Sequence, residues 1–215
     1  MFEPKKIVYL VRHGQSKANT RPVFQGPDSP LTEQGTMQAK RIAERAAGLS
    51  FEALITSPLK RTRQTAEEIG KVTGHTPEFR DLFVERKLPK SVVGRQFGNL
   101  LALRRWWRWE KSLHGSGARV GDGENFQDMV RRIDSALDFL LKRPEKRLLV
   151  VTHALFLRDV VARVVLGDAL TPEILGRFRY KSIVDNTGLT ALAYGRNLDG
   201  MEWRLWTFND RSHLG

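Results

Sequence analysis

Short apolar runs of strand-like composition alternate with helical patterns along most of this chain. The strand-like runs cover residues 7–11, 53–56, 148–152, 189–193 and 203–207. The run at 148–152 is continuous and apolar, as expected for a strand buried on both faces. The last two runs flank Asp199-Gly200, a pair typical of tight hairpin turns. We therefore expect a sheet that ends in a hairpin.

Helical patterns fill the intervals between these runs. Thr32 is a suitable N-cap for a helix that ends near Gly48, and Ser57-Pro58 forms a cap and first-turn pair for a second helix. Apolar side chains recur at helical spacing over 126–141 and again over 157–164. This alternation predicts a three-layer α/β/α fold with a largely parallel sheet, built as a single domain over residues 1–215.

The segment at about 86–124 interrupts the alternation, and we expect it to be a partly helical insertion that caps the edge of the sheet. It contains the run 104–109, in which tryptophans and arginines intermingle, and the glycine-rich run 115–117. The first run is compatible with a lid that supplies cations and flat rings to a substrate or a nucleic acid. It is also compatible with a helix whose tryptophans pack inward, and the three-residue spacing of Trp106 and Trp109 favours this second interpretation.

Composition limits the available chemistry. The chain has 215 residues, a hydrophobic content of 40% and no cysteine, which excludes disulfides, cysteine-ligated zinc and thiol catalysis. Its most apolar region, 148–166, is interrupted by Arg158 and Asp159, and its N-terminus has no apolar leader segment, so we expect no membrane span and a cytoplasmic protein. The net charge of +12 favours anionic partners, although a basic surface can equally serve solubility.

Candidate chemistry gathers where the predicted strands end. The first strand runs into Arg12-His13-Gly14, Arg61 lies at the start of the helix after the second, and His153 follows the third. If these strands are parallel, the three side chains meet at one edge of the sheet, where open α/β folds bind ligands. Guanidinium groups repel metal ions but match the oxygens of a phosphate. We therefore expect a phosphate site with no metal and no cofactor.

The full series of motifs resembles the histidine phosphatase superfamily, which has a phosphoglycerate mutase-like fold. The resemblance covers nearly the whole chain, in the expected order, although Ala154 stands where many members have glycine. The matching segments are Leu10-Val11-Arg12-His13-Gly14-Gln15-Ser16 with Asn19, Leu31-Thr32-Glu33-Gln34-Gly35, Ser57-Pro58-Leu59-Lys60-Arg61 with Gln64-Thr65-Ala66, Gly123-Glu124-Asn125, Val151-Thr152-His153 and Asn186-Thr187.

This resemblance implies a role for each matching residue. His13 is expected to be the nucleophile that forms a phosphohistidine, with a backbone carbonyl on its other ring nitrogen to fix the tautomer. Arg12, Arg61 and His153 are expected to hold the phosphate oxygens. The expected substrate-binding residues of the surrounding pocket are Asn19, Gln15, Ser16 and Gly26.

Glu85 matches the position of the general acid, which protonates the leaving oxygen and later takes a proton from water. Its surroundings lack the Gly-x-Trp-Glu-Gly context of many relatives. Asp81 and Glu124 are therefore alternatives for the same role.

The sequence favours a phosphatase that releases inorganic phosphate from a small phosphomonoester. A phosphoglycerate mutase is an alternative, but nothing in the chain matches the Arg-His-Tyr-Gly segment of cofactor-dependent mutases. A non-catalytic, basic, tryptophan-rich binding module on the same fold is a further alternative, against which the intact set His13, Arg61 and His153 argues. We do not expect a nucleic acid partner, and the substrate and the oligomeric state stay open.

Overall fold

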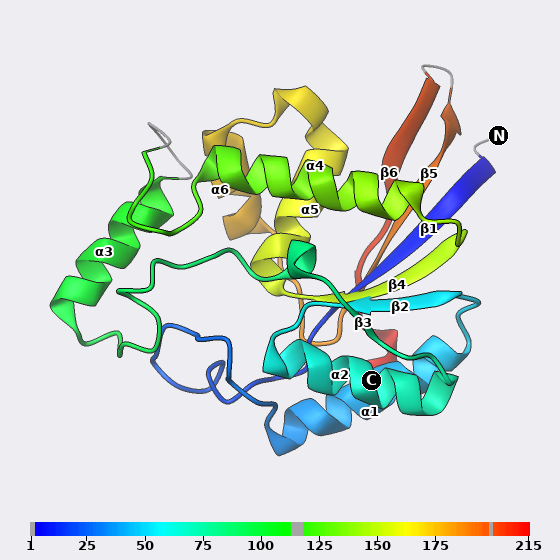
Figure 1. Ribbon diagram of the computed structural model, residues 1–215, viewed down its shortest axis with the longest axis horizontal. Helices are drawn as coiled ribbons and strands as arrows, with labels where there is room; N and C mark the ends of the chain where they lie inside the picture. The colour runs from blue at the N-terminus through cyan, green and yellow to red at the C-terminus, as the bar shows by residue number, and fades with distance from the viewer. Residues whose placement is uncertain (1–2, 113–117, 198–199) are drawn as a thin grey trace.

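Helices cover both faces of a six-stranded sheet with the strand order β3-β2-β4-β1-β5-β6 (Figure 1). The computed structural model describes residues 3–112, 118–197 and 200–215. The strands are β1 (Glu3–Arg12), β2 (Ala53–Thr56), β3 (Glu78–Phe79), β4 (Arg147–Thr152), β5 (Leu189–Asn197) and β6 (Gly200–Asp210). The helices are α1 (Glu33–Ala47), α2 (Lys60–Thr73), α3 (Leu100–Lys111), α4 (Phe126–Lys142), α5 (Ala154–Leu166) and α6 (Pro172–Lys181), and short 3-10 turns follow at η1 (Asp81–Phe83), η2 (Gly167–Ala169) and η3 (Ser212–Leu214).

The two faces of the sheet bury alternate residues of the central strands. Val8 and Leu10 of β1 join a core formed with α4 and α5, whereas Tyr9 and Val11 face a second core formed with α1 and α2. This period of two is what a strand requires when both of its faces are covered. The predicted three-layer α/β fold is confirmed.

The direction of the strands decides where the candidate site lies. β1, β2 and β4 pair in parallel, so their carboxyl ends reach the same edge of the sheet. β5 runs antiparallel to both β1 and β6, which confirms the predicted antiparallel ending. Asp199 of the predicted turn lies outside the described residues.

One helix boundary differs from the sequence prediction. The hydroxyl of Thr32 accepts the backbone N–H of Gly35, so this residue caps α1 as predicted. The next helix, α2, begins only at Lys60, its N-cap is Leu59, and no side chain caps it. The predicted Ser57-Pro58 cap is therefore wrong. The Ser57 hydroxyl instead lies 2.9 Å from Nε2 of His153.

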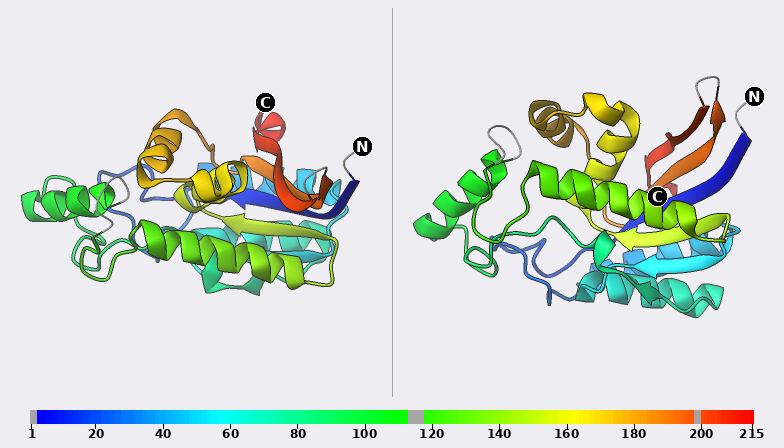
Figure 2. Two further views of the ribbon diagram at one scale, coloured as in Figure 1. Left: turned by 90° about the horizontal axis from the view of Figure 1, so that it is seen from above. Right: turned by 45° about the horizontal axis from the view of Figure 1, so that its top comes forward.

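The predicted insertion contains α3, which stands beyond the carboxyl ends of the strands (Figures 1 and 2). Trp109 is buried and Trp106 is half-buried, whereas Trp107 is exposed. The arginines of the same helix, Arg104, Arg105 and Arg108, are exposed. Thus α3 turns two of its tryptophans inward and its arginines outward. The glycine-rich run 115–117 lies outside the described residues.

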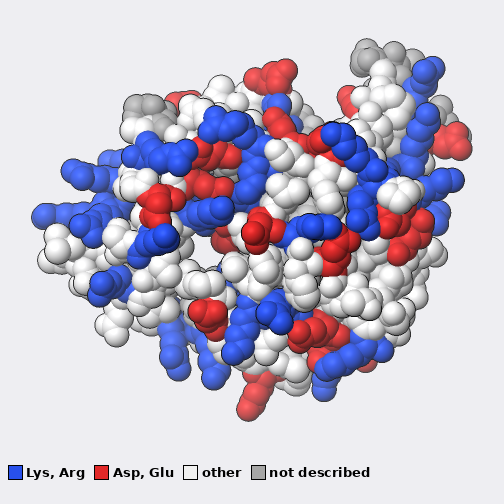
Figure 3. Space-filling view, in the orientation of Figure 1, with Lys and Arg blue, Asp and Glu red and all other residues white. Residues whose placement is uncertain are grey.

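Lysine and arginine side chains cover much of the face seen in Figure 3, most densely around the end that carries α3. None of the described helices combines the length and the apolar composition that a bilayer crossing would need.

Candidate active site

The ends of three parallel strands bring two histidines and a serine together. The backbone N–H of His13, just after β1, donates to the carbonyl of Thr152 in β4 at 3.0 Å. Ser57, just after β2, donates its N–H to Val151 at 3.1 Å. The rings of His13 and His153 lie 5.2 Å apart, edge to face, and both are buried. The sheet register therefore positions these side chains.

The hydrogen bonds of His13 identify its tautomer. Nδ1 lies 2.7 Å from the carbonyl oxygen of Gly14, which can only accept, so Nδ1 carries the hydrogen. Nε2 accepts a hydrogen bond from Nε of Arg61 at 3.1 Å, which requires a lone pair on Nε2. Burial, and then the charges of Arg61 and Arg12, lower the pKa of His13 well below its ordinary value. The ring is therefore neutral near pH 7, with its lone pair on Nε2.

The loop after His13 passes very close to the start of α1. A Cβ on Gly14 would lie 2.4 Å from the carbonyl oxygen of Gly35, and a Cβ on Gly35 would lie 1.9 Å from that of Gln15. Neither approach leaves room for a side chain. This contact explains why Gly14 and Gly35 both belong to the motifs around the candidate nucleophile.

Arg61 and Arg12 supply the positive charge of the site. Arg61 is buried and its Nη1 donates to the carbonyl of Gly26 at 3.1 Å. Burial lowers the pKa of Arg61 to about 10, although the nearby Glu85 charge opposes the shift, so the guanidinium stays charged at neutral pH. Nη1 of Arg12 donates to the carbonyl of Val184 at 2.6 Å.

Two buried nitrogens of this cluster, Nε of Arg12 and Nδ1 of His153, make no hydrogen bond to any of the described residues. Buried polar atoms are nearly always paired in folded proteins. Burial, with Arg61 and His13 as the next contributors, lowers the pKa of His153 well below its ordinary value. The cluster therefore offers polar nitrogens to an anion at the end of the sheet.

The Glu85 side chain is held at the start of α5, the helix that begins directly after His153. Its carboxylate oxygens accept the backbone N–H groups of Leu155 at 3.2 Å and Phe156 at 2.9 Å. The N–H of Arg86 adds a third contact at 3.0 Å. Free N–H groups at a helix N-terminus are natural partners for a carboxylate. These bonds fix the orientation of Glu85.

The two alternatives to Glu85 are placed differently. Asp81 is exposed in η1. Glu124 is buried and accepts two hydrogen bonds from Arg132, at 2.7 and 2.8 Å, and one from the N–H of Lys87 at 2.8 Å. Burial raises the pKa of Glu124, but these contacts outweigh it and lower the pKa below its ordinary value. Glu124 thus closes the base of the insertion, where the chain leaves the core and returns to it.

The predicted substrate-binding residues occupy one loop after β1. Ser16 is buried, and its N–H and hydroxyl both donate to Oδ1 of Asn19, at 2.9 Å each. The Gln15 side chain accepts the Thr32 hydroxyl at 2.8 Å. These bonds stay within the loop and the start of α1, whereas Gly26 contacts Arg61. Direct contact of Asn19, Gln15 and Ser16 with a substrate stays a prediction.

Asn186 and Thr187 support the site in a way that the sequence did not reveal. The Asn186 side chain donates to the carbonyl of His13 at 2.9 Å, and the N–H of Thr187 donates to that of Arg12 at 3.0 Å. Thr187 is buried and has a φ of 61°, which is costly for a β-branched residue. The motif before β5 thus holds the end of β1, and only its resemblance to the family could have indicated this.

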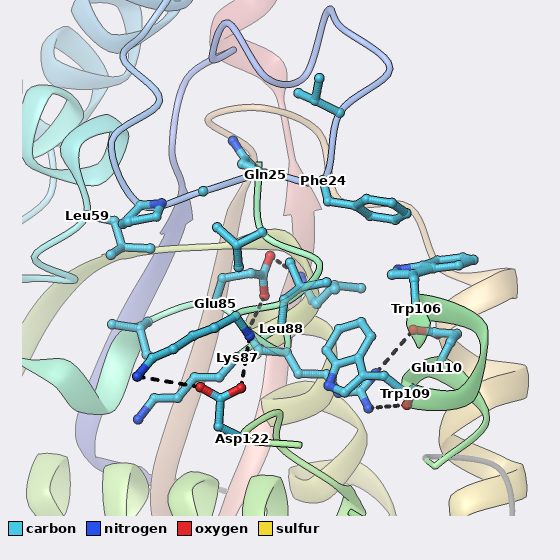
Figure 4. Close-up of a pocket in the computed structure, with 18 of the residues that line it drawn as sticks. Phe24, Gln25, Leu59, Glu85, Lys87, Leu88, Trp106, Trp109, Glu110 and Asp122 are labelled. Carbon is cyan, nitrogen blue, oxygen red and sulfur yellow. Dashed lines mark hydrogen bonds and ion pairs between the residues drawn. The ribbon is translucent and has the colours of Figure 1, made fainter. Parts of the chain in front are cut away.

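A cavity of about 720 Å³ opens beside these groups (Figure 4). Arg61 and Glu85 both line it, so the cavity reaches the candidate phosphate site at Arg61 and contains the candidate acid, whereas Arg12, His13 and His153 lie behind its wall. Its far walls come from the loop at 23–27, the segment 84–93 and the inner face of α3. The arrangement can hold an anion at the sheet edge and a larger organic group under the insertion.

Residues 8–210 match the family model described as histidine phosphatase superfamily (branch 1). The chain belongs to the histidine phosphatase superfamily. A relative named probable phosphoglycerate mutase GpmB, from Salmonella arizonae, is 35% identical over 212 residues, which are 96% of this chain and 94% of that one. Members of this superfamily are phosphatases or mutases, so an enzymatic activity of this kind is supported.

Solved structures share the fold of this histidine phosphatase superfamily chain. The alpha-ribazole phosphatase from Shigella flexneri is 21% identical with a TM-score of 0.76, covering 95% of this chain and 96% of its own. The mycobacterial glucosyl-3-phosphoglycerate phosphatase in complex with inorganic phosphate is 20% identical with a TM-score of 0.74, covering 98% and 100%. At these identities the likeness establishes the fold.

Proposed function

We propose that this chain is a phosphatase that hydrolyses small phosphomonoesters through a phosphohistidine at Nε2 of His13. The observation that carries the proposal is the state of His13. Its ring is buried and neutral, Gly14 fixes the tautomer, and the lone pair of Nε2 faces a charged arginine. A histidine must be in this state to attack phosphorus.

In the first step Nε2 attacks phosphorus and the bond from phosphorus to the leaving oxygen breaks. The N–H of Arg61 that points at Nε2 turns to a phosphate oxygen as the substrate enters. The donors on Arg12, Arg61 and His153 then stabilise the charge that spreads over the phosphate oxygens. The unpaired nitrogens of Arg12 and His153 support this assignment.

Glu85 completes the proposal as the proton carrier. Its carboxyl group gives a proton to the leaving oxygen in the first step. In the second step it takes a proton from the water that attacks phosphorus, the bond to Nε2 breaks, and inorganic phosphate leaves. Its place in the cavity wall beside Arg61 favours Glu85 over the exposed Asp81 and over Glu124, which is bound to Arg132.

The covalent intermediate is the most direct test. The protein reacts briefly with an aryl phosphate, and the reaction is then stopped with alkali. Mass spectrometry of the peptides should find one phosphate on the peptide that contains His13. Inorganic phosphate should be released with a chelator present. Turnover without this modification, or turnover that needs an added metal ion, would contradict the proposal.

A phosphoglycerate mutase is the second candidate, because the relative from Salmonella arizonae carries that name. A mutase returns the phosphoryl group to a second oxygen of the same carbon skeleton instead of passing it to water. Incubation with 3-phosphoglycerate separates the two: a mutase produces 2-phosphoglycerate and little inorganic phosphate, whereas a phosphatase produces inorganic phosphate and glycerate.

A further inference from the structure

The cavity beside the catalytic groups has walls of a distinctive kind. Its size is within the range of sites that bury a drug-sized organic molecule. Phe24, Trp106 and Trp109 lie on one side of it and Leu59 on the other, with Glu85 between them (Figure 4). Further apolar side chains that line it include Val93, Phe97, Leu103 and Leu155.

These aromatic rings contact one another. The Phe24 ring lies 4.8 Å from that of Phe97 and 5.8 Å from that of Trp106, centre to centre. Phe24 and Trp109 are buried. The loop at 23–27 and the stretch 97–109, which are distant in sequence, thus combine into one aromatic wall, which favours flat or branched apolar groups.

The buried cation of this wall, Arg86, is already paired. Arg86 lies 3.1 Å from Glu110, stacks on the Trp109 ring at 3.5 Å, and donates to the carbonyls of Trp109 and Glu124. Lys87 and Lys90 also line the cavity, but both are exposed, and the Lys90 side chain, 3.7 Å from Asp122, is 93% exposed. Neither lysine therefore offers a desolvated cation.

This pairing matters for a substrate with a second negative charge. An additional carboxylate in the leaving group needs a desolvated cation to replace the water it loses. In this cavity it would meet Glu110, Asp122 and Glu85 as well as their partners.

We propose that the cavity selects phosphomonoesters whose leaving group is large, uncharged and mainly apolar, such as an aryl or branched alkyl group, and that it discriminates against leaving groups that carry a carboxylate. This inference rests on the proposed phosphatase activity of the same site. It places the two ends of the substrate in opposite environments, with the phosphate among cations and the alcohol portion among rings.

The test compares kcat/KM for 1-naphthyl phosphate, glycerol phosphate and 3-phosphoglycerate. Because an aryl oxygen leaves more readily than an alkyl oxygen whatever the wall does, cyclohexyl phosphate, an apolar alkyl ester, is measured beside them. We expect naphthyl phosphate to exceed 3-phosphoglycerate by on the order of 100-fold and cyclohexyl phosphate to exceed it by about 10-fold or more, with glycerol phosphate between them. If phosphate is released but 3-phosphoglycerate is equal or better, the assignment of the leaving group is overturned while the phosphatase activity stands. If no substrate releases phosphate, the proposed function itself is wrong.

Two tryptophans of α3 give a matched pair of variants. Trp106→Ala removes a ring from the cavity wall and should lower kcat/KM for naphthyl phosphate about 10-fold while leaving glycerol phosphate within about 2-fold. Trp107→Ala removes the same kind of side chain from the exposed side of the helix, where its ring lies 5.3 Å from that of Trp106, and should change either substrate by less than about 2-fold. Equal losses in both variants, or losses on both substrates, would overturn the proposal.

Two further measurements do not depend on Trp106 alone. Leu103→Arg places a cation in the wall and should shift the substrate ratio toward 3-phosphoglycerate. In His13→Ala, where turnover is blocked, naphthyl phosphate should still bind and quench tryptophan fluorescence, and Trp106→Ala in that background should weaken binding about 10-fold. An unchanged ratio, or equal affinity with and without Trp106, would contradict the assignment.

Discussion

The cluster at the sheet edge and the cavity wall under the insertion, which meet at Arg61, are built on different principles. At the sheet edge, His13, Arg61 and His153 are held by strand register and by hydrogen bonds that leave little freedom. Under the insertion, side chains from separate segments pack through apolar contact, and their buried cation, Arg86, is paired with Glu110. In our proposal the reaction thus belongs to the core of the fold and the choice of substrate to the insertion.

Among the variants, loss of the proposed nucleophile should lower kcat the most. His13→Ala removes the only atom that we propose to bond to phosphorus, so kcat should fall by more than about 1000-fold for every substrate. The fall in kcat is measured by phosphate release from naphthyl phosphate and from glycerol phosphate. A loss confined to one substrate would place His13 in substrate selection instead of chemistry.

Glu85→Gln should have the second largest effect. Its kcat should fall by about 100-fold or more, because the leaving oxygen no longer receives a proton. The loss should be smaller for 4-nitrophenyl phosphate, whose leaving oxygen needs little protonation, than for glycerol phosphate. Steady-state kinetics on both substrates would show this. An equal loss on both would contradict the role of Glu85.

Glu124→Gln is the matched control for that substitution. It breaks a buried ion pair with Arg132, so the free energy of unfolding should fall by about 2–3 kcal/mol. Thermal unfolding should show a lower Tm, while Glu85→Gln should alter Tm less. If Glu124→Gln instead abolishes turnover with the fold intact, Glu124 is the proton carrier.

Gly123→Ala tests the packing of the insertion. A Cβ there would lie 2.6 Å from the Trp109 ring and 2.9 Å from Pro89, so Trp109 must shift. We expect a loss of about 1–3 kcal/mol in the free energy of unfolding. The loss in kcat/KM should be larger for naphthyl phosphate than for glycerol phosphate. Gly98→Ala, which meets nothing within 4 Å, is the control and should be neutral.

Acidification should lower the free energy of unfolding through the two buried histidines at the sheet edge. Unfolded histidines take up protons below about pH 6.5, whereas folded His13 and His153, with their lowered pKa values, do not. The free energy of unfolding should therefore fall as pH drops below about 6.5, by up to about 1.4 kcal/mol per pH unit for each histidine. Tm measured at about pH 7.5 and 5.5 should differ less in His13→Gln than in the unmodified chain. The same slope in both would contradict this.

The smallest effect should come from the outer face of α3. Changing Arg104, Arg105 and Arg108 together to glutamine removes exposed charge away from the cavity wall. We expect kcat/KM for naphthyl phosphate to change less than about 2-fold, since screened surface charges act weakly. A large loss would show that the basic outer face takes part in substrate capture and would favour the binding-module interpretation.

The sequence predicted the cluster at the sheet edge far better than the cavity wall under the insertion. Arg12-His13-Gly14, Arg61 and His153 sit in contiguous motifs at strand ends, and parallel pairing is enough to bring them together. The cavity wall depends on Phe24, Phe97 and Trp106, whose contacts arise only from the path of the insertion. No local pattern encodes that path.

Smaller errors have the same origin. Ser57 reads as a helix cap because serine before proline usually is one, yet its hydroxyl reaches His153 across the sheet edge. The role of Asn186 also lay outside any local signal, because it holds the backbone of a residue 173 positions earlier. Long-range hydrogen bonds of this kind follow from topology.

The anchoring of Glu85 has a consequence for how such enzymes can diversify. Although Glu85 stands at the threshold of the insertion, two of its hydrogen bonds run back to α5, next to His153, and the third comes from the backbone N–H of Arg86, which any residue other than proline would supply. We therefore expect that the segment beyond it can be lengthened, shortened or exchanged without moving the proposed proton carrier relative to the proposed nucleophile. A transplanted insertion, joined after Glu85 and before Glu124, should bring a new substrate preference to an unaltered reaction.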